Sequence, residues 1–402
     1  MSTAQPESVG FSTARLGRIA RLMQGYIDRR ELAGVAVSIA RRGKTIYQDF
    51  WGYMDLEEKK PLRPDTIYRI ASMTKPVTSV AAMMLYEEGH FHLNTPVARF
   101  IPEFDQLQVY QGEDQPPAPL ERPVTFRHLF THTSGIAYGF NPDDPIDRQI
   151  QQVWKKLNES GEDVSARQVV SEILQVPLAF QPGTKWRYGF NIEILGHIVE
   201  RISGQTLAEF MQERIFDPLG MKDTAFYVPA EKCERLAVLY GHLPGQEGLQ
   251  RLPNQEVPTK LPAFQSGGGG LFTTLGDYAR FLQMLAAGGA ANGGRLLSPK
   301  TVSLYSMNHA PAQALPYGFA PKEDLYHAGY GYSLGTRVLR DVSQSGMAGS
   351  AGEFGWDGAF STYFWVDPLL ELYGLMMLQH YPNAYYPVAQ QFKQLTYQVI
   401  IE

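Results

Sequence analysis

The chain has 402 residues, of which 44% are hydrophobic and 19% charged, with a formal net charge of −5. This composition is typical of a globular protein with enough apolar material for one or two cores. The acidic balance argues against nucleic acid or an anionic membrane surface as the main partner. No run approaches the roughly 18 apolar residues that a membrane span needs.

The single cysteine, Cys233, can form no internal disulfide. Residues 1–7 carry neither the basic nor the apolar segment of a secretory leader, so we expect a cytoplasmic protein. The nine histidines include no His-Glu-x-x-His motif, and no zinc site is expected. We expect no cofactor either.

The first elements along the chain are a helix and a β-hairpin. We expect the helix near Thr13 to Arg29. Residues 34–40 and 45–52 are apolar runs rich in β-branched and aromatic side chains, and the segment between them includes Gly43. Two such runs around a glycine-containing turn predict a hairpin.

A second helix follows Ser72-Met73-Thr74-Lys75. Its apolar residues recur at the i, i+3, i+4, i+7 and i+8 spacing of one helix face. They are Val77, Val80, Ala81, Met84 and Leu85, with Ala82 and Met83 widening the stripe. Pro76 fits the first turn, where missing amide donors cost little, and Gly89 ends the helix. The wide stripe predicts a buried helix.

Ser72 and Lys75 stand three residues apart, so on a helix they share one face. A lysine held partly out of water there can take the proton of the serine and make its hydroxyl a nucleophile. This is serine-hydrolase chemistry without a histidine. The motif by itself is equally consistent with Ser72 capping the helix and Lys75 reaching solvent. Roughly one or two Ser-x-x-Lys matches also arise by chance in a chain of this length.

Strand signals return near the C-terminus. Residues 330–338, 360–366 and 372–378 predict three strands, and residues 386–401 predict a closing helix. Between about residue 73 and residue 300 the signals are mostly helical, with long loops.

The N-terminal and C-terminal strands are expected to share one antiparallel sheet. The sheet domain then comprises residues 1–72 and 301–402, with a mostly helical region at 73–300 inserted into it. A cleft between two such regions is where a small-molecule site is expected. We therefore place the active site there.

Residues 181–189 predict a turn that leads into a helix ending at Gly204. Tyr188 lies just before this helix. The positive end of the helix dipole, together with a neighbouring ammonium, would favour phenolate character. Tyr188 could then relay a proton between Ser72 and the leaving group, although a tyrosine at such a position is also consistent with simple packing.

The segment Gly355-Trp356-Asp357-Gly358-Ala359 enters a strand near the C-terminus. A backbone N–H at the edge of this strand, which we assign to Ala359, could join that of Ser72 in an oxyanion hole. The same segment is also consistent with a turn that places a tryptophan in the core.

Three other motifs are expected to be structural. Ala348-Gly349-Ser350-Ala351-Gly352 departs from the Gly-x-Ser-x-Gly nucleophile motif at its first residue, and no strand leads into it, so we expect a flexible loop. We expect His132 to be a hydrogen-bonded structural histidine. Gly267 to Gly270 lacks the Lys-Ser/Thr ending of a phosphate-binding loop, and we expect a tight turn beside the cleft.

Taken in order, the motifs of this chain resemble those of one superfamily. They are Ser72-x-x-Lys75, Leu129 to Gly135, Pro-Gly-x-x-x-x-Tyr ending at Tyr188, Ser266 to Leu271, and Trp356-x-Gly358. The combination is similar to class C β-lactamases and penicillin-binding proteins, and most similar to the family VIII carboxylesterases. The resemblance covers roughly residues 10 to 395.

The resemblance implies an α/β fold of the α+β type, β-lactamase/transpeptidase-like, in which helices flank an antiparallel sheet and a mostly helical region is inserted. It also implies that Ser72 is the nucleophile and that Lys75 and Tyr188 share the general-base and general-acid roles. The expected activity is hydrolysis of small neutral carboxylic esters through an acyl-enzyme. The alternatives are a β-lactamase, a D-amino-acid peptidase or amidase, and a catalytically silent β-lactam-binding or sensor protein.

The chain departs from the β-lactamase pattern in two places. Tyr188-Gly189-Phe190 stands where those enzymes carry Tyr-x-Asn, and Asn191 is displaced by one position. Trp356-Asp357-Gly358 stands in place of Lys-Thr-Gly, which removes the cation and the hydroxyl that would hold a substrate carboxylate. We expect these three residues to bind substrate, with Asp357 repelling a carboxylate and Trp356 offering an apolar wall to a small ester.

Overall fold

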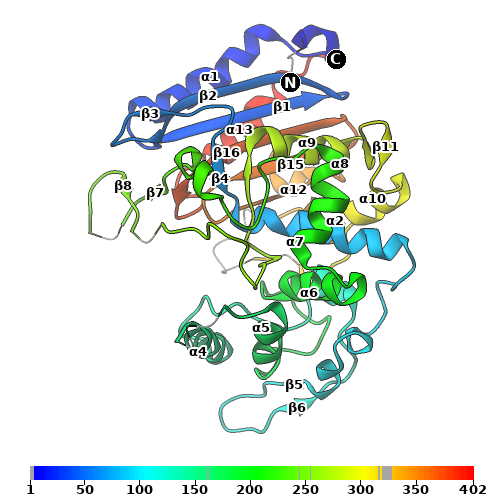
Figure 1. Ribbon diagram of the computed structural model, residues 1–402. Coiled ribbons are helices and arrows are strands. Elements are labelled where there is room, and N and C mark those ends of the chain that lie inside the picture. Colours follow the sequence, from blue (N-terminus) through cyan, green and yellow to red (C-terminus); the bar gives the residue numbers. More distant parts are fainter. Residues whose placement is uncertain are drawn as a thin grey trace.

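The computed structural model of the protein is built on one large antiparallel sheet (Figure 1). It describes residues 4–159, 161, 163–243, 245–253, 255–315, 317–318 and 328–402. Within these residues the sheet has eight strands in the order β12-β13-β14-β15-β16-β1-β2-β3. The strands are β1 (Gly34–Arg41), β2 (Lys44–Asp55), β3 (Lys60–Pro61), β12 (Tyr330–Tyr332), β13 (Arg337–Leu339), β14 (Phe354–Asp357), β15 (Tyr363–Asp367) and β16 (Leu372–Leu378).

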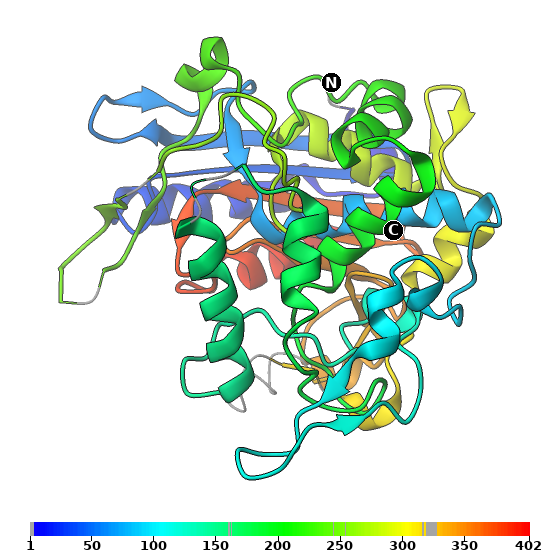
Figure 2. The ribbon, with the colours of Figure 1, turned by 60° about the horizontal axis from the view of Figure 1, so that its bottom comes forward.

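Strands from the two ends of the chain meet inside this sheet. β1 pairs with β2 on one side and with β16 on the other, so that Val37 lies opposite both Asp49 and Met376. Figure 2 shows these strands side by side, in blue and orange-red. The predicted hairpin and the predicted sharing of one antiparallel sheet are therefore confirmed.

Two helices, α1 (Thr13–Asp28) and α13 (Val388–Tyr397), cover one face of the sheet (Figure 1). Their apolar side chains, such as Ile19 and Phe392, form a core with Trp365 and Met376 of the strands. The first and last described residues lie close together on this side (Figure 1).

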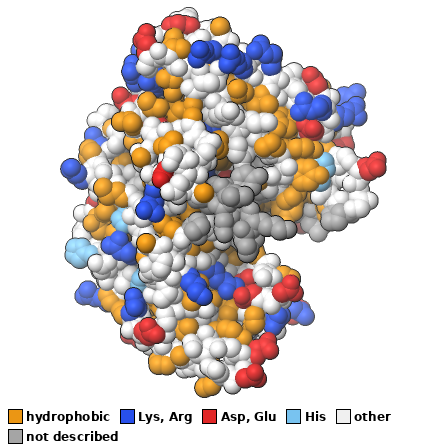
Figure 3. Space-filling view, turned by 180° about the vertical axis from the view of Figure 1, so that it is seen from behind, with side chains coloured by type: hydrophobic (Ala, Val, Ile, Leu, Met, Phe, Trp, Pro, Cys, Tyr) orange, Lys and Arg blue, Asp and Glu red, His pale blue; other side chains and the backbone are white. Residues whose placement is uncertain are grey.

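The opposite face of the sheet carries the helical part of the chain (Figure 1). There, α2 (Thr74–Glu87) is buried from Thr74 to Leu85 and packs against α6 (Asn191–Ser203), while α9 (Leu275–Ala286) packs on β1 and β16. The predicted helix after Ser72 and its burial are confirmed. The outline of the molecule is indented on one side between the sheet part and the helical part (Figure 3).

Apart from α4, the other elements are short. The helices are α3 (Phe126–Phe130), α4 (Pro145–Glu159), α5 (Ala166–Ile173), α7 (Leu207–Met211), α8 (Asp217–Leu219), α10 (Pro299–Ser306) and α12 (Val342–Ser345). The strands are β4 (Ile67–Arg69), β5 (Gln108–Val109), β6 (Ala118–Pro119), β7 (Tyr240–Gly241), β8 (Gln250–Arg251), β9 (Phe272–Thr274), β10 (Ala290–Ala291), β11 (Gly294–Arg295) and β17 (His380–Tyr381). Across the described part of the chain, no helix has the length and apolar character to cross a membrane.

The C-terminal strands differ from the prediction in their bounds. The strand expected at 330–338 is a hairpin of β12 and β13, because Gly335 turns the chain at φ +101°. The strand expected at 360–366 begins only at Tyr363, after a turn in which Ser361 has φ +65°. The closing helix spans Val388–Tyr397 rather than residues 386–401.

A buried ion pair fastens α13 to the far end of the sheet. Lys393 and Glu353 form a salt bridge and are at most 1% exposed. Lys393 Nζ also donates a hydrogen bond to the Tyr330 hydroxyl at 3.1 Å, and the Tyr397 hydroxyl lies within hydrogen-bond distance of both Glu353, at 2.6 Å, and Asp367, at 2.8 Å. Glu353 directly precedes β14, so this network fixes the strand that carries Trp356 and Asp357.

Replacing Lys393 alone should destabilise the protein strongly. Lys393→Met leaves the Glu353 carboxylate buried without its cation, which costs about 3–5 kcal/mol of unfolding free energy. The double variant Lys393→Met with Glu353→Leu should recover most of the loss, because neither charge remains buried. Urea unfolding at neutral pH measures both. A double variant as unstable as the single one would show that packing, not the unpaired charge, sets the cost.

Candidate active site

Ser72 lies in a short 3₁₀ turn, Ala71–Met73, that runs directly into α2. Ala71 has φ +43°, a backbone conformation that is rare for residues other than glycine and is concentrated at functional sites. Lys75 places Nζ 3.2 Å from Ser72 Oγ. The N-cap of α2 is Met73, and Lys75 is 1% exposed. The alternatives in which Ser72 caps the helix and Lys75 reaches solvent are therefore wrong.

Lys75 is held from several sides. Its Nζ donates a hydrogen bond to the Gly268 carbonyl at 2.7 Å and lies 4.5 Å from the ring centroid of Tyr188 and 5.1 Å from that of Tyr138. Burial lowers the pKa of Lys75 to about 8, although the Glu193 and Asp357 carboxylates oppose this shift. A lysine with this pKa can accept a proton near neutral pH, as a general base must.

Tyr188 closes the other side of Ser72. It is buried, and its hydroxyl interacts with the side chains of Ser72 and Trp356, whose Nε1 lies 3.4 Å away. Burial raises the pKa of Tyr188 above its usual value and outweighs these two interactions. The Lys75 ammonium lies over the ring. The expected phenolate character is therefore wrong, and a neutral hydroxyl can instead donate a proton to a leaving group.

Trp356 forms an aromatic wall behind Tyr188. It is 2% exposed and packs against the rings of Tyr188, Tyr332 and Tyr317, with centroids 5.9, 5.3 and 6.4 Å away. The tryptophan is thus a core residue and at the same time a neighbour of Tyr188 in the candidate site. An indole N–H near Tyr188 stands where the resemblance would place a lysine.

The end of β14 passes directly against the segment that precedes Ser72. A Cβ atom on Gly358 would clash with the Ile70 carbonyl, so the position requires glycine. Thr362 Oγ1 donates to the same carbonyl at 3.4 Å. This approach brings residues 358–359 next to the Ser72 turn, and the oxyanion hole of Ser72 and Ala359 N–H groups stays a prediction.

The Asp357 carboxylate is paired with a cation. Its Oδ2 lies 3.7 Å from Nη1 of the buried Arg337, whose guanidinium also lies over the ring of Tyr363. The Asp357 side chain is 38% exposed. Because a cation on the neighbouring strand opposes its charge, the sequence-based argument that Asp357 repels a substrate carboxylate loses most of its force.

Asn191 and His132 support the Tyr188 loop from inside. Asn191 is fully buried and hydrogen-bonds to Ser134 at 2.5 Å and to His132 Nδ1 at 3.0 Å, so its amide is engaged within the protein. His132 Nδ1 also accepts from the Gly189 N–H at 3.3 Å. Burial lowers the pKa of His132 well below its usual value. The prediction of a structural, hydrogen-bonded His132 is confirmed.

His128 and His132 stand four residues apart, a spacing that zinc ligands also use. Their rings face different partners, because His128 Nδ1 accepts from the Thr125 N–H at 3.2 Å while His132 Nδ1 faces Gly189 and Asn191. Among the residues that the structure describes, no three His, Cys, Asp or Glu side chains are placed to hold a metal ion.

Two loops have the forms that the sequence predicts. Residues 267–270 make the tight turn whose carbonyl holds Lys75. Residues 348–352, including Ser350, form a loop between α12 and β14 rather than a strand-to-helix turn. Ser350 therefore lacks the geometry of a nucleophile motif.

The sequence analysis missed two residues that face Lys75. Tyr138 offers its ring to the ammonium, and its hydroxyl donates to Glu193 Oε1 at 2.6 Å. Glu193 is 5% exposed in the first turn of α6. Glu193 lies on the helix face of His197 and Glu200, opposite the apolar residues, so no pattern along the chain singles out either Glu193 or Tyr138.

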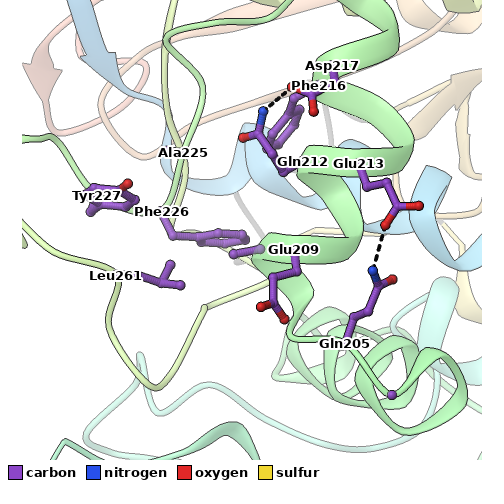
Figure 4. A pocket seen from close by; sticks show the side chains of 12 residues that line it. Gln205, Glu209, Gln212, Glu213, Phe216, Asp217, Ala225, Phe226, Tyr227 and Leu261 are labelled. Atoms are coloured by element: carbon purple, nitrogen blue, oxygen red, sulfur yellow. Dashed lines mark hydrogen bonds between the residues drawn. The ribbon is translucent and has the colours of Figure 1, made fainter.

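A separate cavity of about 530 Å³ lies along α7 (Figure 4). It is lined by Gly204, Gln205, Ala208, Glu209, Gln212, Glu213, Phe216, Asp217, Ala225, Phe226, Tyr227 and Leu261. Two of its carboxylates, Glu213 and Asp217, accept hydrogen bonds from Gln205 and Gln212, as Figure 4 shows. Neither Ser72 nor its partners line this cavity, so it is distinct from the candidate active site.

Comparison with known proteins finds relatives over nearly the whole chain. The family model described as Beta-lactamase matches residues 19–398. Esterase EstB of Burkholderia gladioli is 31% identical and covers 94% of each chain, and lovastatin esterase of Penicillium rubens is 32% identical over 89% of this chain and 91% of its own. Among solved structures, EstCE1, described as a hydrolase with promiscuous acyltransferase activity, superposes with a TM-score of 0.78 at 24% identity. It covers 95% of this chain and 98% of its own, and confirms the predicted fold class.

We expect Lys75 and Tyr188 to act as one proton-transfer unit, because both contact Ser72. Lys75→Ala and Tyr188→Phe should each lower kcat severely, and the double variant should be little worse than the poorer single one, since groups that act together lose activity non-additively. The readout is kcat for p-nitrophenyl butyrate in the parent, the two single variants and the double variant. Losses that multiply would mean that the two residues act independently.

Proposed function

The chain belongs to the beta-lactamase family and is a serine hydrolase, and we propose that it cleaves small neutral carboxylic esters through an acyl-enzyme on Ser72. One observation carries the assignment of the nucleophile. Lys75 Nζ, kept out of water, lies 3.2 Å from Ser72 Oγ, and the Tyr188 hydroxyl contacts the same side chain.

The reaction follows from the positions of these groups. Lys75 takes the proton of Ser72 as Oγ forms a bond to the ester carbonyl carbon, and the N–H groups of Ser72 and Ala359 receive the oxyanion. The C–O bond to the alcohol then breaks, and Tyr188 donates a proton to the departing oxygen. Tyr188 regains its proton from the Lys75 ammonium. Water attacks the acyl-Ser72 ester by the same route and releases the carboxylic acid.

The lining of the site favours an apolar, uncharged substrate. Trp356 occupies the position of a lysine that would hold a carboxylate, and its buried ring packs against Tyr188 instead. Phe140 is 68% exposed and stacks on Tyr138, with the two ring centroids 5.0 Å apart. Its ring centroid lies 6.4 Å from that of Tyr188. Such an exposed aromatic beside the catalytic residues can cover the acyl or alcohol group of an ester. The esterase names of two relatives support this proposal.

Ser72→Ala should reduce ester hydrolysis to near background. Removing the nucleophile of such a unit typically costs on the order of a million-fold in turnover. Ser350→Ala is the matched control and should keep full activity. After treatment with a fluorophosphonate, peptide mass spectrometry should find the adduct on Ser72; an adduct on Ser350 instead would overturn the assignment.

The ester should be the better substrate when p-nitrophenyl butyrate is compared with a chromogenic cephalosporin. The site lacks the lysine that would donate a charge-assisted hydrogen bond to the cephalosporin carboxylate, and such a bond is worth about 1.5–3 kcal/mol. We therefore expect kcat/KM to be at least about tenfold higher for the ester than for the cephalosporin. Asp357→Asn should shift this ratio toward the cephalosporin, because it leaves the Arg337 charge without its opposing carboxylate.

A cephalosporin that equals or beats the ester would favour a β-lactamase instead. An acyl adduct that forms on Ser72 and never turns over would favour a catalytically silent sensor. Both outcomes would contradict the esterase proposal while leaving Ser72 as the reactive residue.

A further inference from the structure

Glu193 is a buried carboxylate that the proposed reaction does not yet use. It lies in the first turn of α6 and is 5% exposed. Its Oε1 accepts the hydrogen bond of Tyr138 at 2.6 Å, and the Ser266 side chain also stabilises the charged form of the carboxylate. A carboxylate placed this way carries a large desolvation cost, which a purely structural role would not justify.

The Glu193 carboxylate lies directly behind the groups that hold Lys75. A Cβ atom on Gly268 would clash with this carboxylate, so Glu193 packs against the residue whose carbonyl accepts the Lys75 hydrogen bond. On a second side, the Tyr138 hydroxyl is bound by Glu193 while the Tyr138 ring lies under the Lys75 ammonium. Two independent contacts therefore join Glu193 to the surroundings of Lys75.

We propose that Glu193 is a positioning residue that fixes the Gly268 carbonyl and Tyr138 around Lys75 and supplies the counter-charge for the Lys75 ammonium. The inference rests on the proposed function. When the Ser72 O–H bond breaks, its proton moves to Lys75 Nζ and its electron pair forms the new bond to the ester carbonyl carbon. The Glu193 carboxylate acts on this ammonium through space, keeps its own charge and does not touch the substrate.

The charges around Lys75 agree with this role. Glu193 is the main charge that raises the pKa of Lys75 against burial, and Asp357 acts in the same direction. In turn, Lys75 is the main charge that opposes the burial-driven rise in the pKa of Glu193, with help from the hydroxyls of Tyr138 and Ser266. The other titratable neighbours stay neutral, because burial raises the pKa values of Tyr138 and Tyr188 and lowers that of His132.

Glu193→Gln tests the charge while keeping the shape and the acceptor for Tyr138. The readout is the pH dependence of two rates: inactivation of Ser72 by a fluorophosphonate, and kcat/KM for p-nitrophenyl butyrate. In the parent both should rise with pH as Lys75 loses its proton, around its pKa of about 8. Without the anion the ammonium is less stable, so the midpoint should fall by about one pH unit, and the plateau rate should drop.

Two variants serve as controls. Glu193→Asp keeps the charge, so its midpoint should stay near that of the parent even if the plateau rate falls. Glu200→Gln removes the same kind of group from the same helix, where it pairs with His197 rather than with the surroundings of Lys75, and should leave the midpoint unchanged. Tyr138→Phe removes a hydrogen bond that stabilises the charged form of Glu193. It should therefore lower the midpoint, but by less than Glu193→Gln does.

The outcomes separate this inference from the function on which it rests. If the parent is labelled on Ser72 but Glu193→Gln has the parent's midpoint, Glu193 has no role as a counter-charge. Equal midpoints for Glu193→Gln and Glu193→Asp would overturn the inference as well. Should Glu193→Gln not fold, an unmoved midpoint in Tyr138→Phe overturns it. A parent that is not labelled on Ser72 would instead contradict the proposed function itself.

Discussion

The burial of Lys75 is the constraint on which the rest of this site depends. The pKa of an ammonium in water lies about three units above neutral pH, which is too high for it to serve as a base there. Enclosing it lowers that pKa, but an enclosed cation must still be hydrogen-bonded and balanced by charge. The Gly268 carbonyl, the rings of Tyr138 and Tyr188, and the carboxylates of Glu193 and Asp357 meet these requirements together.

The fold supplies these partners from distant parts of the chain. Helix α2 and the turn before it bring Lys75 and Ser72, α6 and the loop before it bring Glu193 and Tyr188, and β14 brings Trp356. Gly358 is needed where β14 passes directly against the Ile70 carbonyl, and Gly268 leaves room for the Glu193 carboxylate against its backbone. At the end of the sheet, the buried pair of Lys393 and Glu353 anchors the segment that leads into β14. The catalytic arrangement is therefore a property of the whole packing, not of one motif.

Much of this could be predicted from the sequence, because the decisive signals are local. The apolar spacing after Ser72 predicts a buried helix, and the N-terminal hairpin and the resemblance together predict the antiparallel sheet. The position of Tyr188 beside the helix start is equally local. Its ionisation is not, because burial depends on residues such as Trp356 and Tyr332 that fold against it from the other end of the chain.

The remaining errors have the same origin. The charge of Asp357 is balanced by Arg337, which lies on the neighbouring strand and reaches Asp357 only through the register of the sheet. Tyr138 sits in a loop with no periodicity, and its role depends on where Lys75 and Glu193 lie. Patterns along the chain indicate which residues share one element, whereas pairs formed across elements decide charge and protonation.

The most direct test of this account is the pKa of Lys75 itself. In protein labelled at the lysine Cε with ¹³C, the Lys75 signal can be assigned by its loss in Lys75→Arg and followed as the pH is raised. Its titration midpoint should lie near pH 8, well below that of an exposed lysine. A midpoint at or above about 10.4, the ordinary value, would contradict the claim that burial makes Lys75 the base that activates Ser72.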